Sequence, residues 1–115
     1  MARSSNKNDL YMLGKIREAL IEGNIIWRQH VLARMLERNI SREDVYNTIQ
    51  YGDIIESYLE TKPYPSCLIA GSPGNKQVHV VAAWDDEAYA VYIITVYTPD
   101  REHFQENGIT RKARK

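Results

Sequence analysis

One segment of the chain carries three side chains that suit phosphodiester chemistry. His30, Arg34 and Arg38 follow one another at four-residue intervals, so a helix would place them on one face. Histidine titrates near neutral pH and can act as a general base or acid, while guanidinium groups bind phosphate through paired hydrogen bonds. One interpretation is a face that binds an anion and moves a proton. The other is the solvated side of an amphipathic helix.

The helix that would carry this face is expected over residues 29–37, and residues 25–27 are expected to run into it. Leu32, Met35 and Leu36 form the apolar side that would pack against the rest of the protein. The cationic side would then face away from the core.

Two further helices flank this one. The first is expected over residues 10–22, with Asp9 as its cap and Gly23-Asn24 as its stop. The third is expected to begin at Ser41, because Asp44 three residues later nearly completes a capping box, and to end at Gly52.

After residue 52 the pattern changes to β-branched and aromatic residues, separated by segments rich in proline and glycine. The expected strands are 53–60, 66–70, 78–84 and 89–97. Helices followed by strands predict an α+β fold, with the helices packed on one face of a four-stranded antiparallel sheet. We expect a single domain over residues 1–115, with flexible tails at 1–8 and 105–115.

The strand pattern offers partners for the cationic helix. Side chains alternate between the faces of a strand, so His79 and Val81 share one face of the third strand, and Thr95 and Tyr97 share a face of the fourth with Val91 and Ile93. If the two strands pair near their middles, His79 lies on the same face as Thr95 and Tyr97. His79 can equally be a half-buried, hydrogen-bonded strand residue. Tyr97 can donate to a phosphate oxygen or stack on a base.

Composition narrows the function classes. The 15 Lys and Arg residues balance the 15 Asp and Glu residues, so nucleic-acid binding would need a local patch. The lone Cys67 excludes an internal disulfide and is expected in the core. We expect no metal, no cofactor and no membrane span, because no spaced ligand motif and no long apolar run occurs. Residues 1–7 lack a secretory signal, so a cytoplasmic protein is expected.

The chain resembles a bacterial family known as the domain of unknown function 4258, over about residues 28–100. Its first half carries the pattern His30-x-x-x-Arg34-Met35-x-Glu37-Arg38-x-Ile40-Ser41, followed by Asp44-Val45 and Gly52-Asp53-Ile54-Ile55. Its second half carries Tyr64-Pro65-Ser66, His79-Val80-Val81 and Ile94-Thr95-Val96-Tyr97-x-Pro99-Asp100.

The resemblance implies a function. Members resemble small toxins of toxin–antitoxin pairs, and their layout looks like the fold of RelE-type and barnase-type ribonucleases. The likeness implies a metal-independent ribonuclease whose partners are an RNA substrate and an antitoxin protein. The implied site residues are His30, Arg34, His79, Thr95 and Tyr97, with Arg38 nearby to bind phosphate.

A non-enzymatic binding module is the alternative. In that case His30 and Arg34 would be structural, and the edge of the sheet would dock a partner. The neutral net charge favours it, because RelE-like proteins are usually strongly basic. The oligomeric state and the order of acid and base stay open.

Overall fold

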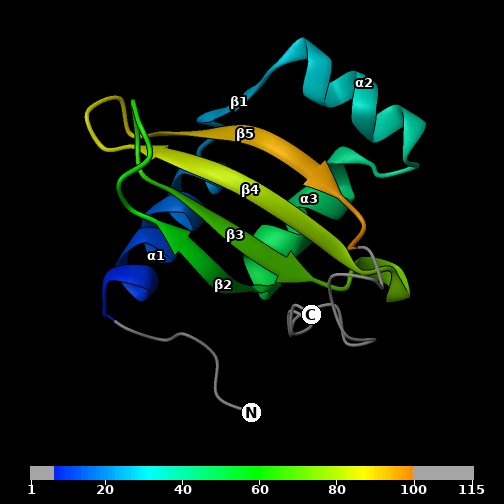
Figure 1. Cartoon of the computed structure of the whole chain (residues 1–115), viewed down its shortest axis with the longest axis horizontal. Helices are drawn as coiled ribbons and strands as arrows, with labels where there is room; N and C mark the ends of the chain where they lie inside the picture. The colour runs from blue at the N-terminus through cyan, green and yellow to red at the C-terminus, as the bar shows by residue number, and fades with distance from the viewer. Residues whose placement is uncertain (1–6, 100–115) are drawn as a thin grey trace, which may run out of the picture.

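The computed structural model describes residues 7–99, which fold into a layer of helices and a five-stranded sheet (Figure 1). The helices are α1 (Lys7–Ile21), α2 (Gln29–Glu37) and α3 (Arg42–Tyr51), with a short 3-10 turn η1 (Pro73–Asn75). The strands are β1 (Ile25–Trp27), β2 (Asp53–Tyr58), β3 (Ser66–Gly71), β4 (Val78–Asp85) and β5 (Ala90–Tyr97).

The α+β class is confirmed, but the sheet differs in one strand. Its order is β1-β5-β4-β3-β2, and β2 to β5 form the expected antiparallel meander. The residues expected to lead into the second helix instead form β1, which pairs parallel to β5. Three apolar residues are too short a run to signal a strand by themselves. They form a strand because they pair with β5, for example Ile26 with Tyr92, and this contact is distant in sequence.

Helix α1 begins earlier than predicted, at Lys7, so residues 7 and 8 are helical rather than part of a tail. Asp9 is therefore not a cap. It lies inside the first turn, is buried, and accepts a hydrogen bond from Ser57 of β2. The predicted stop is confirmed, because Gly23 adopts a φ of +81°, which glycine reaches without strain.

The other two helices begin and end as predicted within a residue. Helix α3 has the capping box in full: Ser41 accepts from the Asp44 backbone, and the Asp44 carboxylate accepts from the Ser41 backbone. Helix α2 covers the predicted residues. Of the residues predicted for the apolar side of α2, only Met35 is buried, and Leu36 is 84% exposed. The buried side of α2 is formed by Val31 and Met35, which are four residues apart.

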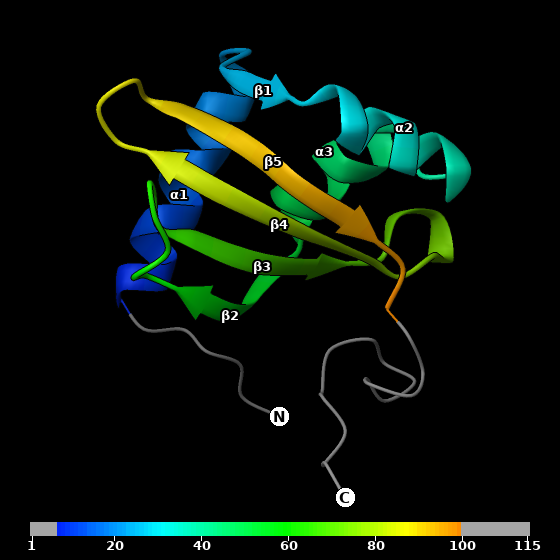
Figure 2. The same ribbon diagram turned by 45° about the horizontal axis from the view of Figure 1, so that its top comes forward.

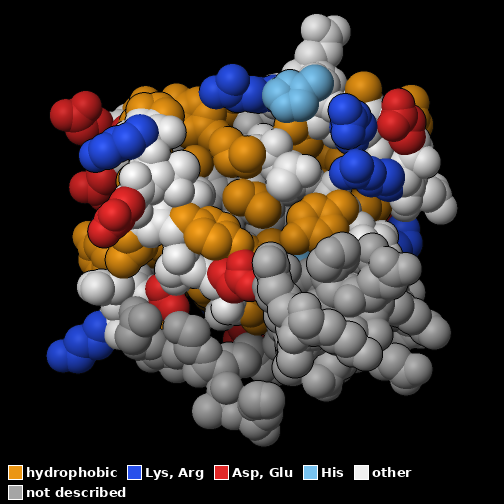
Figure 3. Space-filling model, in the orientation of Figure 1, with side chains coloured by type: hydrophobic (Ala, Val, Ile, Leu, Met, Phe, Trp, Pro, Cys, Tyr) orange, Lys and Arg blue, Asp and Glu red, His pale blue; other side chains and the backbone are white. Residues whose placement is uncertain are grey.

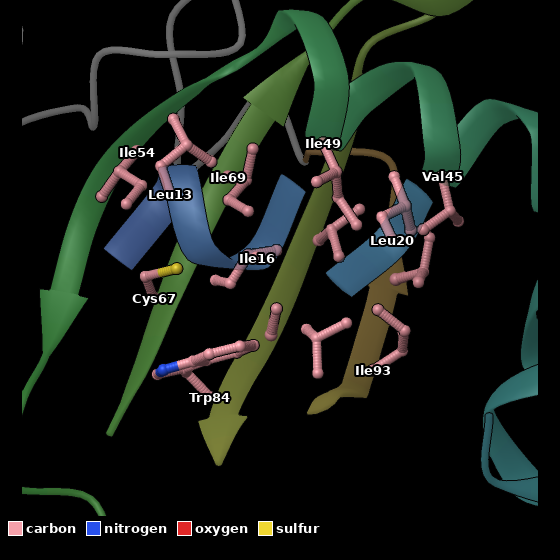
Figure 4. Close-up of a cluster of buried hydrophobic side chains, with 14 of the residues drawn as sticks. Leu13, Ile16, Leu20, Val45, Ile49, Ile54, Cys67, Ile69, Trp84 and Ile93 are labelled. Carbon is pink, nitrogen blue, oxygen red and sulfur yellow. The ribbon is translucent and has the colours of Figure 1, made fainter. Parts of the chain in front are cut away.

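The core lies between the sheet and the helices. Figure 4 shows Leu13, Ile16 and Leu20 of α1 packing with strand residues such as Ile69 and Ile93. Figure 2 shows α1 and α3 behind the sheet, while α2 continues from β1 along the edge of β5. Two of the three helices thus cover one face as expected, and α2 lies at the border of that layer.

Helix α3 approaches β3 very closely. A Cβ atom at Gly52 would lie 2.3 Å from the backbone oxygen of Ala70 and 2.4 Å from that of Thr48. A Cβ at Gly71 would come within 3.1 Å of Thr48. The two glycines therefore permit a contact that no larger residue allows at Gly52.

The predicted tails fall largely on residues 1–6 and 100–115, which lie outside the described residues. Within residues 7–99, no helix combines the length and apolar character needed to cross a bilayer.

Candidate functional site

Helix α2 presents its cationic residues away from the core, as predicted. Val31 and Met35 are buried against the other elements, whereas His30 and Arg34 are exposed. Within residues 7–99, the Arg34 side chain makes no hydrogen bond or ion pair that would compete with an anion. Arg34 also stands in the last turn of α2, where a cation complements the negative end of the helix dipole.

Arg38 makes a structural contact with the sheet. Its Nη1 atom donates to the backbone oxygen of Val96 over 2.7 Å, a short charge-assisted hydrogen bond. Val96 lies near the end of β5, beyond the stretch that pairs with β1. The contact therefore satisfies a strand carbonyl and fixes the end of α2 to the sheet. Arg38 was predicted to bind phosphate, and at least one of its nitrogens has another partner.

The predicted sharing of a face by His79, Thr95 and Tyr97 is confirmed. In the antiparallel ladder His79 pairs with Tyr97, and Val81 pairs with Thr95. Residues paired directly across a ladder lie on the same face. This is the face opposite α1 and α3, hereafter the outer face; Figure 1 views the sheet from this side.

The register reaches this result through a β-bulge that the sequence pattern did not indicate. Ala82 pairs with Ile93 while Val81 pairs with Thr95, so Ile94 is the extra residue. The bulge reverses the alternation. Val91, Ile93 and Val96 face the core, and the prediction that Thr95 and Tyr97 share a face with Val91 and Ile93 is wrong.

His79 and Tyr97 are in direct contact. Their ring centroids are 5.3 Å apart in an edge-to-face arrangement, and the His79 Nδ1 atom lies 3.4 Å from the Tyr97 hydroxyl. That distance is long for a hydrogen bond. His79 is 1% exposed, while Tyr97 is half-buried. The tyrosine is thus the more accessible member of the pair.

Arg38 connects the end of α2 to the strand that carries Thr95 and Tyr97. Its partner Val96 precedes Tyr97, which contacts His79. Arg34 and His30 lie earlier on the same helix, about 6 Å and about 12 Å along the axis at 1.5 Å per residue. In Figure 3, Lys, Arg and His side chains line the border of the outer face over α2, and hydrophobic side chains occupy its centre.

An aromatic cluster that the sequence pattern did not predict lies on the same face. Tyr64 and Tyr92 stack with centroids 5.4 Å apart and planes 9° apart, and the Arg28 guanidinium lies 5.8 Å from the Tyr92 ring centre. All three line a cavity of about 190 Å³ together with Lys62 and Ile94. None of the six predicted site residues lines this cavity. The available signal was Tyr64 between two prolines, a rigid setting for an aromatic side chain.

The surroundings of the Tyr64 hydroxyl favour its protonated form. The Asp85 carboxylate has the largest effect and Tyr92 adds to it, so the pKa of Tyr64 is raised to about 12. The Asp85 carboxylate is itself buried and accepts from the backbone N–H groups of Glu87 and Ala88, each over 3.1 Å. The ring of Tyr64 is positioned by its stack on Tyr92 and by the prolines on either side of it.

Two other candidate chemistries find no support among the described residues. Cys67 is fully buried, and burial, with a smaller effect of Asp9, raises the pKa of its thiol to about 12. Such a thiol is not a nucleophile. Within residues 7–99, no three His, Cys, Asp or Glu side chains gather closely enough to hold a metal ion.

Comparison with known proteins gives a family. The domain of unknown function DUF4258 matches residues 27–98, the segment from β1 to the end of β5. No curated protein and no solved structure matches the chain. The match covers well over half of the 115 residues and includes every predicted site residue. The chain therefore belongs to the DUF4258 family.

Proposed function

We propose that this protein is a metal-independent ribonuclease of the toxin type, whose substrate lies on the outer face of the sheet beside α2. The observation that carries the proposal is the pairing of His79 with Tyr97 and of Val81 with Thr95. It gathers an imidazole and two hydroxyl groups next to a helix that bears His30 and Arg34. The likeness to RelE-type and barnase-type ribonucleases stated above supports the same activity.

The proposed reaction needs two proton transfers. One group removes the proton from a ribose 2′-hydroxyl, and the freed oxygen attacks the adjacent phosphorus. The bond from phosphorus to the 5′-oxygen breaks, and a second group donates a proton to that oxygen. The products are a 2′,3′-cyclic phosphate and a 5′-hydroxyl.

The burial of the two histidines suggests how each would take part. His30 is exposed and can meet the substrate directly. His79 is 1% exposed and would act through the Tyr97 hydroxyl, 3.4 Å from its Nδ1 atom. Arg34 would bind the phosphate and stabilise the charge that develops there. Arg38 would be chiefly a positioning residue, because it bonds to Val96.

The test is RNA cleavage in the presence of a chelator. Purified wild-type protein is incubated with mixed RNA beside His30→Ala, His79→Ala and His79→Gln variants. Gln29→Ala is the matched control, since Gln29 is exposed in the same turn of α2 as His30. We expect cleavage by wild type and Gln29→Ala and a loss of at least about 100-fold in the histidine variants. Absence of cleavage by wild type, or equal cleavage by all, refutes the proposal.

A second candidate is a non-enzymatic binding module. Two observations favour it: His79 is almost wholly buried, and Arg38 serves a strand carbonyl. Expression in a host that lacks an antitoxin discriminates between the candidates. Growth arrest by wild type but not by His30→Ala supports the toxin, whereas normal growth with full expression supports the module.

A further inference from the structure

The aromatic cavity on the outer face has the features of a ligand site. Its walls include the stacked rings of Tyr64 and Tyr92, and two cations, Arg28 and Lys62, stand among its lining residues. Both tyrosines are half-buried rather than sealed in the core. The cavity thus combines accessible aromatic rings with positive charge.

The size of the cavity limits the ligand. Its volume is about 190 Å³, below the range of roughly 300–1,000 Å³ that is typical of pockets for drug-sized ligands. A single ring system fits such a space, and a larger molecule would extend out of it. One planar group carried by a longer molecule would match this volume and the flat aromatic walls.

The walls are rigid before any ligand binds. Tyr64 stands between Pro63 and Pro65, which restrict its backbone. Tyr92 belongs to β5 and is stacked on Tyr64. A preformed aromatic surface loses little conformational entropy when a second ring stacks on it.

We propose that the cavity lined by Arg28, Tyr64 and Tyr92 binds one unpaired base of a single-stranded RNA. Stacking on aromatic side chains beside cations is how proteins hold single strands, because every base has a π-face and every nucleotide carries a phosphate. A base within a duplex is not available to enter the cavity. The inference rests on the proposed function, since it assigns a binding position to that substrate.

The position of the cavity fits a strand that continues to the proposed catalytic residues. Tyr92 and Ile94 lie on β5 upstream of Thr95 and Tyr97. Tyr92 pairs with Ala83 and Tyr97 with His79, four residues apart on β4, so at about 3.4 Å per residue the two positions are about 14 Å apart along the sheet. The Arg28 guanidinium, 5.8 Å from the centre of the Tyr92 ring, can neutralise a phosphate next to the bound base.

The test measures binding separately from cleavage. A fluorescent single-stranded RNA hexamer with 2′-O-methyl riboses cannot be cut by the proposed reaction, so its anisotropy reports affinity alone. Tyr92→Leu removes the stacking ring, and Tyr92→Phe keeps it. Tyr51→Leu is the matched control, because Tyr51 is 81% exposed on α3, in the helical layer behind the sheet.

We expect Tyr92→Leu to bind the hexamer about 10-fold or more weakly, while Tyr92→Phe and Tyr51→Leu bind as wild type does. Removing the base at one nucleotide should weaken binding to wild type and leave binding to Tyr92→Leu unchanged. Circular dichroism melts verify that each variant is folded. If Tyr92→Leu is unfolded, Tyr64→Leu takes its place in the same comparison, because Tyr64 is the other ring of the stack.

Two results overturn the inference. Equal affinity in Tyr92→Leu and Tyr51→Leu would show that the cavity does not hold a base. Absence of hexamer binding by wild type would show that the cavity does not bind single-stranded RNA. Wild type that binds through Tyr92 but does not cut unmodified RNA contradicts the proposed ribonuclease and leaves the base site standing. If wild type cuts unmodified RNA but Tyr92→Leu binds the hexamer as tightly as wild type, the ribonuclease proposal stands and the base site is refuted.

Discussion

Replacing Arg38 by alanine tests whether this residue holds α2 against the sheet. Its guanidinium donates to the Val96 carbonyl over 2.7 Å, and a hydrogen bond to a charged group contributes about 1.5–3 kcal/mol to stability. Because Arg38 is exposed and water competes for the bond, we expect the low end of this range. The free energy of unfolding should fall by about 1.5 kcal/mol.

Urea denaturation followed by tryptophan fluorescence measures this change, since the chain has two tryptophans. With an m-value of about 1.5 kcal/mol/M, the midpoint should fall by about 1 M. Arg34→Ala is the control, because it removes the same type of side chain one turn earlier. Its stability should stay within about 0.5 kcal/mol of wild type. Equal midpoints for Arg38→Ala and Arg34→Ala would refute the anchoring role.

Three further predictions concern the fold. Gly52→Ala would place a Cβ atom 2.3 Å from a backbone oxygen and should cost about 3 kcal/mol or more. In contrast, a Cβ atom added at Gly14 would have no atom within 4 Å, so Gly14→Ala should stabilise α1 by about 0.5–1 kcal/mol. Thermal melts of the two variants measure both changes in stability. Partial burial acts to raise the pKa of Asp44, but hydrogen bonds from the helix N-cap and from Lys76 lower it below the ordinary 3.8. The ionised Asp44 carboxylate therefore stabilises the fold above about pH 3.8, and this stabilisation is lost as the pH falls through its lowered pKa. Asp44→Asn should lower the free energy of unfolding at pH 7 and leave it unchanged at pH 2. Urea denaturation at both pH values measures the difference. The buried Cys67 thiol should react with a disulfide reagent at pH 8 only after urea unfolds the protein.

Local signals were enough to predict most elements. The capping box from Ser41 to Asp44 fixed the start of α3, and residues 29–37 form α2 as the periodicity indicated. Two features escaped because they depend on contacts distant in sequence. Strand β1 exists through its pairing with β5, and the bulge at Ile94 adapts β5 to β4. Neither leaves a strong mark on the local pattern.

The candidate site was predictable in part, where local strand alternation decides which side chains share a face. The shared face of His79, Thr95 and Tyr97 follows from strand alternation near the pairing partners, and it holds because the bulge lies upstream of Thr95. Burial was not predictable. That His79 would be 1% exposed depends on the surrounding packing, not on its strand position. The stack of Tyr64 on Tyr92 joins a loop to a distant strand and had no sequence signal of its own beyond the flanking prolines.

The most direct test of the proposed ribonuclease activity is a substrate in which one nucleotide carries a 2′-deoxyribose. The protein is given, under chelator, an RNA oligonucleotide that it cuts at a known bond and the same oligonucleotide with the 2′-hydroxyl removed at that bond alone. The account predicts a 2′,3′-cyclic phosphate on the cut fragment and no cleavage at the modified position. Cleavage that persists without the 2′-hydroxyl, or that yields no cyclic phosphate, would contradict it.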